Sequence, residues 1–469
     1  MRKRYLHDIQ TWLIFLLAVI AIVSSFYFMM GRTARVFEEP MKSAITGWDG
    51  SFHYFWLRSV LVDGDVDFRN DLEYCNTMPV EVKENARKLE LTKTGLMPNK
   101  YPLGWAVLSV PWFYIGDLLT IVANTFGRSL ERDGYSLYYQ LSITFGHYLY
   151  SFLSLYISFL ILRRFFNRKV SILAILLVWL ASALYYYQVG QPNMTHHLTY
   201  LLVVTGYYLT FKLKDNPERL ICWAALGFCA GLLVITRYQA VVYLLFPVII
   251  VIKLLRINKV AYITGFVTLF LAAFIAIFPQ LLAWKLLYGE WIVYTYNGET
   301  FNWLAPGIGK VLFSPFHGWF YWHPVMLLGM TGLIVFSVRQ KKLEYFFWIV
   351  IVFLMIYINA SWHAWWFGAS FGARAFGGCT IFVMIGIAQL LTSAKEKVYL
   401  RNLLLLVLSF LVIWNMNLLY LFKYQDKTKI RMNKPLTYKE IVTKSISFYK
   451  WRFASEEKRR ERNDQFNYH

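Results

Sequence analysis

The chain has 469 residues, of which 58% are hydrophobic and 19% aromatic, while only 16% are charged. A soluble domain of this length cannot bury so much apolar surface, and several apolar runs exceed ~18 residues, so the composition excludes a soluble globular protein. The formal net charge of +21 falls mostly between the apolar runs and in the C-terminal tail, which excludes the single basic face of a nucleic-acid-binding protein. We therefore expect an all-α polytopic membrane protein that is embedded in the lipid bilayer.

The first apolar run, residues 11–31, follows a basic N-terminus and could be mistaken for a signal peptide. Signal peptides end in small side chains at the cleavage site, whereas residues 26–30 (FYFMM) are bulky. We expect this run to be retained as the first membrane span.

A long polar segment, residues 32–137, follows the first span. Within it, residues 52–62 and 79–91 are predicted to form short helices, and residues 63–71 (DGDVDFRND) a turn-rich connection. Residues 104–123 are apolar enough to span, but prolines, glycine and an aspartate interrupt them, which favours a helix lying in the membrane interface.

The rest of the chain is a series of apolar runs joined by two kinds of connection. One kind is short and basic, such as Arg163 and Arg164 or Lys341 and Lys342, and the positive-inside rule places it in the cytoplasm. The other kind is rich in Trp, Tyr, His, Asn and Gly and falls on the outside. Ten further spans are predicted, at about 138–162, 170–188, 197–213, 219–235, 239–255, 260–284, 319–337, 344–360, 376–393 and 401–422.

This alternation predicts about eleven spans, within a range of ten to thirteen, in a plasma (inner) membrane, with the N-terminus in the cytoplasm. Residues 1–424 form the membrane module, and 32–137 are its first external loop. Residues 425–469 form a basic tail on the extracytoplasmic side, in which residues 438–453 carry the apolar spacing of an amphipathic surface helix.

The unusual polar residues all fall on the outer side, which predicts a functional site there. Asp49 stands without a second carboxylate in its motif and suits a general base. Arg237 and Arg374 have no acidic neighbour in sequence, and Lys100 lies beside the interfacial helix. These cations suit the binding of a phosphate head group, and Tyr101 is expected to take part in it. Further candidates for the pocket are His53, Asn193, His196, His197, Glu299, His317, His363, Trp365 and Trp366.

Several of these residues also have plainer interpretations. The tryptophans suit an interfacial aromatic belt as well as sugar stacking, and Arg237 can equally pair within the bundle. The histidines lack a spaced pair on one helix face, so zinc is disfavoured and a divalent metal remains possible without support. Asp63, Asp65 and Asp67 lack the remaining positions of a calcium loop and suit a solvated turn.

The order of these motifs resembles that of a known enzyme class. An Asp follows the first span, a Lys-Tyr-Pro-Leu-Gly segment (residues 100–104) precedes an interfacial helix, and residues 312–318 (LFSPFHG) and 365–374 (WWFGASFGAR) precede later spans. This arrangement resembles the GT-C membrane glycosyltransferases, especially bacterial relatives of the protein O-mannosyltransferases and of the lipid A aminoarabinose transferase. Those mannosyltransferases carry Asp-Glu in the first loop, whereas Asp49 is followed by Gly50 here.

The resemblance implies a GT-C-like bundle and transfer of a sugar from a polyprenyl-phosphate donor to a glycan, lipid or protein acceptor, without a required cofactor. It implies that Asp49 is the catalytic base of an inverting displacement and that Lys100, Arg237 and Arg374 stabilise the leaving phosphate. The alternative is a transporter or flippase of a lipid-linked sugar. Alternating access calls for polar groups near mid-membrane or an internal repeat, and neither is evident in the sequence.

Overall fold

The computed structural model describes residues 2–38, 47–74, 80–296, 298–428, 430–431 and 433–454. Throughout these ranges every regular element is a helix, which confirms the all-α prediction. Parts of the predicted first external loop (39–46 and 75–79) and the last part of the tail (455–469) lie outside the described residues.

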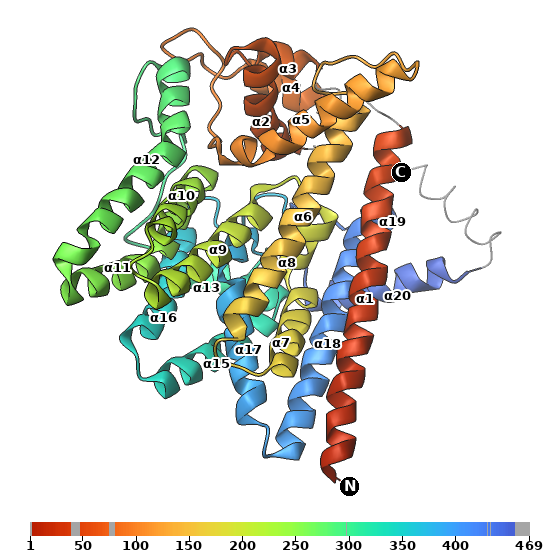
Figure 1. Cartoon of the computed structure of the whole chain (residues 1–469). Coiled ribbons are helices and arrows are strands. Elements are labelled where there is room, and N and C mark those ends of the chain that lie inside the picture. Colours follow the sequence, from red (N-terminus) through yellow and green to blue (C-terminus); the bar gives the residue numbers. More distant parts are fainter. Residues whose placement is uncertain are drawn as a thin grey trace.

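Long apolar helices form a bundle that runs most of the length of the molecule (Figure 1). Eight helical segments in the described ranges are long and apolar enough to cross a membrane, or nine if one bent pair counts as a span. They confirm a polytopic membrane protein, while the count of eleven spans stays a prediction. The longest helices are α1 (Arg2–Glu38), α5 (Gly104–Thr125), α6 (Leu137–Leu162), α9 (Thr195–Asp215), α12 (Lys259–Tyr288), α16 (Leu343–Ser361) and α18 (Val398–Lys423). Of these, α9 is not one of the eight candidate spans, which also include the segments Tyr238–Ile257 and Arg374–Ser393.

Shorter helices complete the bundle, and some predicted spans are broken. The predicted span at 170–188 divides into α7 (Arg168–Leu180) and the α8–η2 segment, which bend by 77°. The span at 319–337 stops at His323, because Pro324 has no N–H to continue the helical ladder, and it resumes as α15. The other short elements are α8 (Ala183–Tyr185), η2 (Tyr186–Gly190), α10 (Leu220–Thr236), η3 (Tyr238–Leu244), α11 (Leu245–Ile257), α13 (Ile308–Phe313), α14 (Trp319–Trp322), α15 (Val325–Gln340), η4 (Arg374–Cys379), α17 (Thr380–Ser393), α19 (Gln425–Thr428) and α20 (Tyr438–Arg452).

Close helix contacts in the bundle depend on glycine. On α15, Gly329 and Gly332 lie directly against Gly386 of α17, and an added Cβ at any of the three would overlap backbone atoms of the other helix. The same holds for Gly227 of α10 against α12. Small residues let helix backbones approach where lipid gives no hydrophobic driving force between helices.

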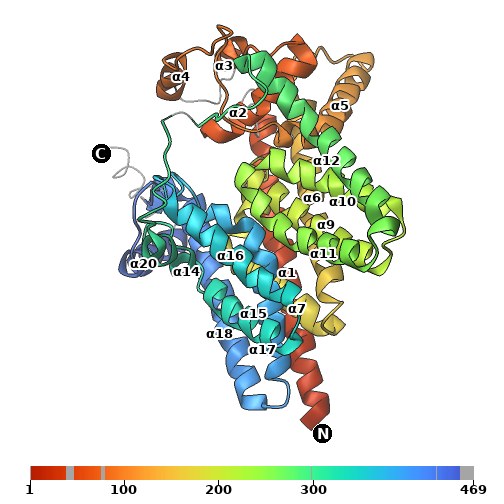
Figure 2. The ribbon, with the colours of Figure 1, turned by 90° about the vertical axis from the view of Figure 1, so that its left-hand side faces the viewer.

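A small helical cap covers one end of the bundle. It contains α2 (Gly47–Arg58), η1 (Ser59–Asp63), α3 (Arg69–Tyr74) and α4 (Val80–Arg87), and α5 runs across it at a steep angle to α6 (Figures 1 and 2). The cap has its own core, in which Tyr54, Phe55, Trp56 and Trp105 are fully buried. The length and composition of α5 suit a membrane span, so its interfacial position stays a prediction.

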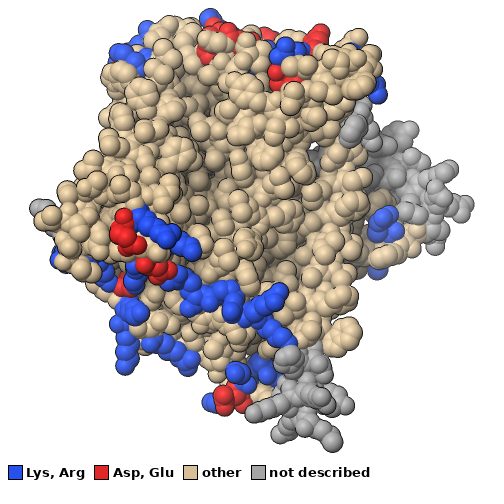
Figure 3. Space-filling view, in the orientation of Figure 1, with Lys and Arg blue, Asp and Glu red and all other residues tan. Residues whose placement is uncertain are grey.

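Charged side chains mark the two ends of the molecule. Figure 3 shows acidic and basic side chains together on the cap, a broad belt without charge, and a mostly basic band toward the opposite end. The belt matches the apolar layer of a bilayer.

Helix α18 ends near the upper part of α1, where the Tyr27 and Tyr424 hydroxyls share a hydrogen bond. The tail therefore leaves the bundle far from the first turn of α1. The predicted surface helix of the tail is present as α20.

Candidate active site at the cap–bundle junction

A cavity of about 350 Å³ lies where the cap meets the bundle. Its walls come from distant parts of the chain: α2, the 100–102 segment, the junction of α10 and η3, the 294–301 segment and the region from α16 to η4. Of the predicted site residues, the cavity is lined by Asp49, His53, Lys100, Tyr101, Arg237, Glu299, His363 and Arg374.

Asp49 lies in the first turn of α2. A carboxylate at this position faces the positive end of the helix dipole. Its Oδ2 atom lies 3.0 Å from a guanidinium nitrogen of Arg374, and its Oδ1 accepts a hydrogen bond of 2.5 Å from the Tyr101 hydroxyl. His53 follows one turn later, on the same face of the helix.

These contacts set the charge of the site. Burial alone raises the pKa of the Asp49 carboxyl, but the Arg374 guanidinium and the Tyr101 hydroxyl, with smaller effects from His53 and Lys100, hold it below its ordinary value. For His53, burial lowers the pKa to about 4, against a smaller opposing effect of Asp49. At neutral pH the site therefore holds a carboxylate beside a neutral imidazole, whose Nδ1 atom has no hydrogen-bond partner among the described residues.

The 99–102 segment is fastened to α2, so that Tyr101 is held against Asp49. The Asn99 side chain donates to the Phe52 carbonyl (2.8 Å), and the Trp56 indole donates to the Tyr101 carbonyl (2.9 Å). The ring of Tyr101 also lies 4.8 Å from that of His53. The Lys-Tyr-Pro motif thus positions a hydroxyl donor on the candidate base.

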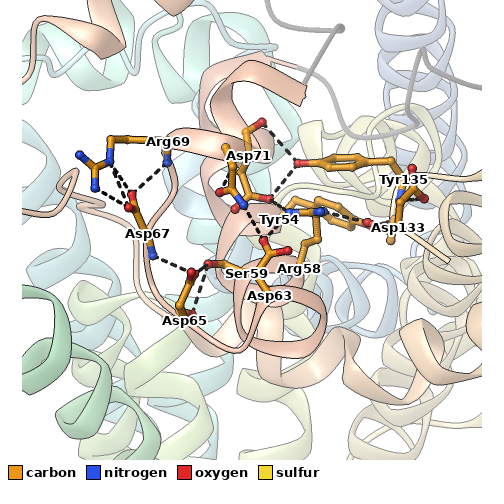
Figure 4. A network of polar contacts seen from close by, with 12 residues as sticks. Tyr54, Arg58, Ser59, Asp63, Asp65, Asp67, Arg69, Asp71, Asp133 and Tyr135 are labelled. Carbon is orange, nitrogen blue, oxygen red and sulfur yellow. Dashed lines mark hydrogen bonds and ion pairs between the residues drawn. The ribbon is translucent and has the colours of Figure 1, made fainter. Parts of the chain in front are cut away.

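The far end of α2 is anchored in the cap by Arg58. Its guanidinium bonds to the buried carboxylate of Asp71 (3.0 Å) and to Asp63 (2.5 Å), and its Nε donates to the Asp133 carbonyl (2.8 Å). Figure 4 shows these contacts converging on Arg58, with Tyr135 closing over Asp71. The acidic segment 63–71, interpreted as a solvated turn, is therefore partly a structural anchor for the helix that carries Asp49.

The three predicted phosphate-binding cations differ in their partners. Arg374 pairs with Asp49, and Lys100 pairs with Glu299, although neither has an acidic neighbour in sequence. Arg237 caps α10 and donates to His196 Nδ1 at 2.9 Å. Among the described residues no carboxylate forms an ion pair with Arg237. The cavity therefore offers one cation whose charge is not neutralised by direct pairing.

One wall of the cavity is aromatic. Tyr296, Phe301 and Trp362 line it together with Tyr238 and Tyr294. Phe301 and Trp362 form an antiparallel backbone bridge and their ring centroids lie 5.2 Å apart. Phe301 and Trp362 were not among the predicted site residues, because an aromatic residue beside a span end is common at membrane interfaces and carries no distinguishing pattern.

The other predicted pocket residues lie away from the cavity surface. His196 stands behind Arg237, and His197 packs 5.0 Å from His147 inside the bundle. Asn193 is buried beside Thr144. His317 bonds to the Trp366 carbonyl, and Trp365 and Trp366 pack around Phe316. They were predicted to line the pocket because the predicted topology places them on the outer side. Many side chains with a purely structural role are predicted on the same side.

A buried polar stripe on α6 was missed from the sequence. Thr144, His147, Ser151, Ser154 and Ser158 recur at intervals of three or four residues and are almost completely buried. They bond mainly among themselves and to neighbouring helices, as when Gln188 donates to Ser154 (2.8 Å). The expectation that the spans carry no polar groups near mid-membrane is therefore wrong. The stripe holds neighbouring helices together through hydrogen bonds.

The fold and the cavity define a polytopic helical membrane protein with a charged, aromatic-walled site at one end of its bundle. Compared with known proteins, the chain matches no family model and no curated protein sequence. In the described ranges no three His, Cys, Asp or Glu side chains gather as a metal site.

Proposed function

We propose that the protein is a glycosyltransferase that moves a sugar from a polyprenyl-phosphate carrier to an acceptor hydroxyl at the extracytoplasmic face of the plasma membrane. The observation that carries the proposal is the meeting of Asp49, Arg374 and Arg237 around one cavity at an end of an apolar bundle. A carboxylate base and phosphate-binding guanidiniums are the two kinds of group that such a transfer needs. The mostly basic band at the opposite end supports a cytoplasmic position for that end.

The proposed reaction is a single displacement at the anomeric carbon. The acceptor hydroxyl oxygen forms the new bond to carbon while the bond from carbon to the phosphate oxygen breaks. The hydroxyl proton passes to the Asp49 carboxylate, and the polyprenyl phosphate leaves with one additional negative charge. Arg237 and Arg374 stabilise that charge as it develops, and the aromatic wall offers flat faces for the sugar rings.

The pairing of Asp49 with Arg374 suggests how the base is prepared. Without substrate, the guanidinium lowers the pKa of the carboxyl and so makes it a weak base. A donor phosphate competes for the same guanidinium. When Arg374 turns toward the phosphate, Asp49 loses its strongest stabilising neighbour and becomes a better proton acceptor.

The test is transfer by the purified protein in liposomes that contain a polyprenyl-phosphate sugar. Comparative mass spectrometry of glycans and lipids from cells with and without the gene first identifies the sugar and the acceptor. We then expect Asp49→Asn to reduce the rate of transfer by ~10²–10⁴-fold, the range for loss of a general base, while insertion into the membrane is retained. Asp49→Glu, which keeps the carboxylate, should retain more activity. Near-normal transfer by Asp49→Asn would contradict the proposal.

A flippase of the same lipid is the second candidate. The buried polar groups on α6 bond to neighbouring helices, but they are also the kind of side chain that transporters carry along their spans. The same liposomes separate the two functions. A flippase moves the lipid-linked sugar between leaflets without breaking its phosphate bond, whereas the transferase releases free polyprenyl phosphate.

A further inference from the structure

The segment between α12 and α13 connects the cavity to the lipid-facing side of the bundle. Figure 2 shows it leaving the end of α12 and descending toward the end of α16. Residues 300–302 pair with 361–363 through backbone hydrogen bonds, including Asn302 N–H to the Ser361 carbonyl (2.6 Å) and His363 N–H to the Thr300 carbonyl (3.0 Å). This short ladder fixes the segment against the end of α16.

Three aromatic rings form a continuous face across this ladder. Phe301 lines the cavity, and its ring stacks on that of Trp303 with centroids 4.8 Å apart and planes within 6°. Trp303 in turn stacks on Tyr357 of α16 at 5.8 Å, and the Tyr357 hydroxyl donates to the Trp303 carbonyl (2.6 Å). We name Phe301, Trp303 and Tyr357 the aromatic ramp.

The outer end of the ramp continues a lipid-facing surface. On α16, Phe346, Val350 and Phe353 are exposed and precede Tyr357 at intervals of three or four residues, so all four share one helix face. This face belongs to a candidate membrane span. Leu304, directly after Trp303, is also fully exposed. Exposed apolar side chains that gather on one face are typical of a membrane interaction site.

We propose that the aromatic ramp is the path by which the hydrocarbon chain of the lipid-linked substrate leaves the cavity for the outer leaflet. This inference rests on the proposed function, because that function requires an amphiphile with its head group at Asp49 and its chain in the bilayer. The ramp is an apolar surface that joins those two places. Phe301 lies at the cavity end, and Trp303 lies between Phe301 and Tyr357 of α16. Leu304 and the exposed face of α16 lie at the membrane end.

The kinetic test compares two donors with the same sugar phosphate, one with a full-length polyprenyl chain and one with a chain of about two isoprene units. We expect Trp303→Ala and Leu304→Ser to raise KM for the long-chain donor by about 10-fold, because apolar contact area is lost. KM for the short-chain donor and kcat for both should stay unchanged. Trp291→Ala is the matched control, since Trp291 is exposed on the same segment but lies outside the ramp. Equal changes for both donors, or no change for either, would overturn the proposed path.

A photolabelling experiment tests the path without catalysis. A polyprenyl phosphate that carries a benzophenone in its chain should label peptides containing residues 301–304 and the end of α16, and excess unlabelled polyprenyl phosphate should prevent this. Equal labelling by a benzophenone phospholipid would show an ordinary lipid-facing surface and overturn the proposal. Labelling of the ramp without sugar transfer by the wild type contradicts the transferase alone, and transfer with labelling elsewhere contradicts the path alone.

Discussion

The carboxylate of Asp49 lies 3.0 Å from the guanidinium of Arg374, although the two residues are far apart in the sequence. The pair joins the cap to the bundle across the cavity, because Asp49 belongs to α2 and Arg374 begins η4. Its two members serve different parts of the proposed reaction, one as the base and one as a phosphate ligand.

Removing the Arg374 charge should change the pH dependence of transfer. With the guanidinium present, the pKa of Asp49 lies below its ordinary value, so the base stays ionised as pH falls. In Arg374→Gln the burial of the carboxyl is no longer opposed by that charge, and the pKa of Asp49 rises. We expect the acidic limb of the kcat/KM profile to move to higher pH. Arg374→Lys keeps the charge and is the control, and superimposable profiles for all three proteins would contradict the prediction.

Arg237 should contribute to donor affinity more than to stability. A charged hydrogen bond to a phosphate is worth about 1.5–3 kcal/mol, so we expect Arg237→Ala to raise the apparent KM for the donor by roughly 10–100-fold. Arg237→Lys keeps the charge but loses the forked geometry, and its effect should be intermediate. Thermal unfolding in detergent is measured in parallel. A lower Tm with unchanged KM would show that Arg237 only pairs with His196 inside the bundle.

Arg58 should stabilise the cap. Replacement by Met leaves the carboxylate of Asp71 buried without its cation, which costs roughly 3–5 kcal/mol in comparable buried pairs. We expect Arg58→Met to lower the Tm by several degrees and to reduce transfer, since α2 also carries Asp49. Arg69→Met is the matched control from the same acidic segment, because Arg69 pairs with Asp67 at the exposed surface, and it should leave the Tm unchanged. A similar Tm for both variants would contradict the anchoring role.

His53 should make the fold sensitive to acid. Its pKa falls from 6.5 to about 4 on burial, so the unfolded chain binds a proton more readily than the folded one in this range. The free energy of unfolding is therefore highest above about pH 6.5 and declines as pH falls toward 4, by at most ~3 kcal/mol from this residue. We expect the Tm of the wild type to fall over this window and that of His53→Gln to fall less. Parallel curves would show that His53 does not contribute.

The sequence by itself determined the class of the protein, because long apolar runs and basic connections follow directly from the free energy of transferring side chains into a bilayer. It also singled out Asp49, Arg237 and Arg374, since isolated charges beside spans are costly and therefore rare. The breaks in two spans were not predicted: the expected span at 319–337 ran through Pro324, and the expected span at 170–188 is divided by the bend after α7.

Only the tertiary structure decided which of these residues share a site. Ion pairs such as Asp49 with Arg374 and Lys100 with Glu299 join segments that are distant in sequence, and side-chain chemistry alone does not specify such partners. The same reason explains why His197 and His317 were expected in the pocket but pack elsewhere, and why Phe301 and Trp362 were missed. A position on the outer side follows from the count of spans, but a position in the cavity follows from how the cap docks on the bundle.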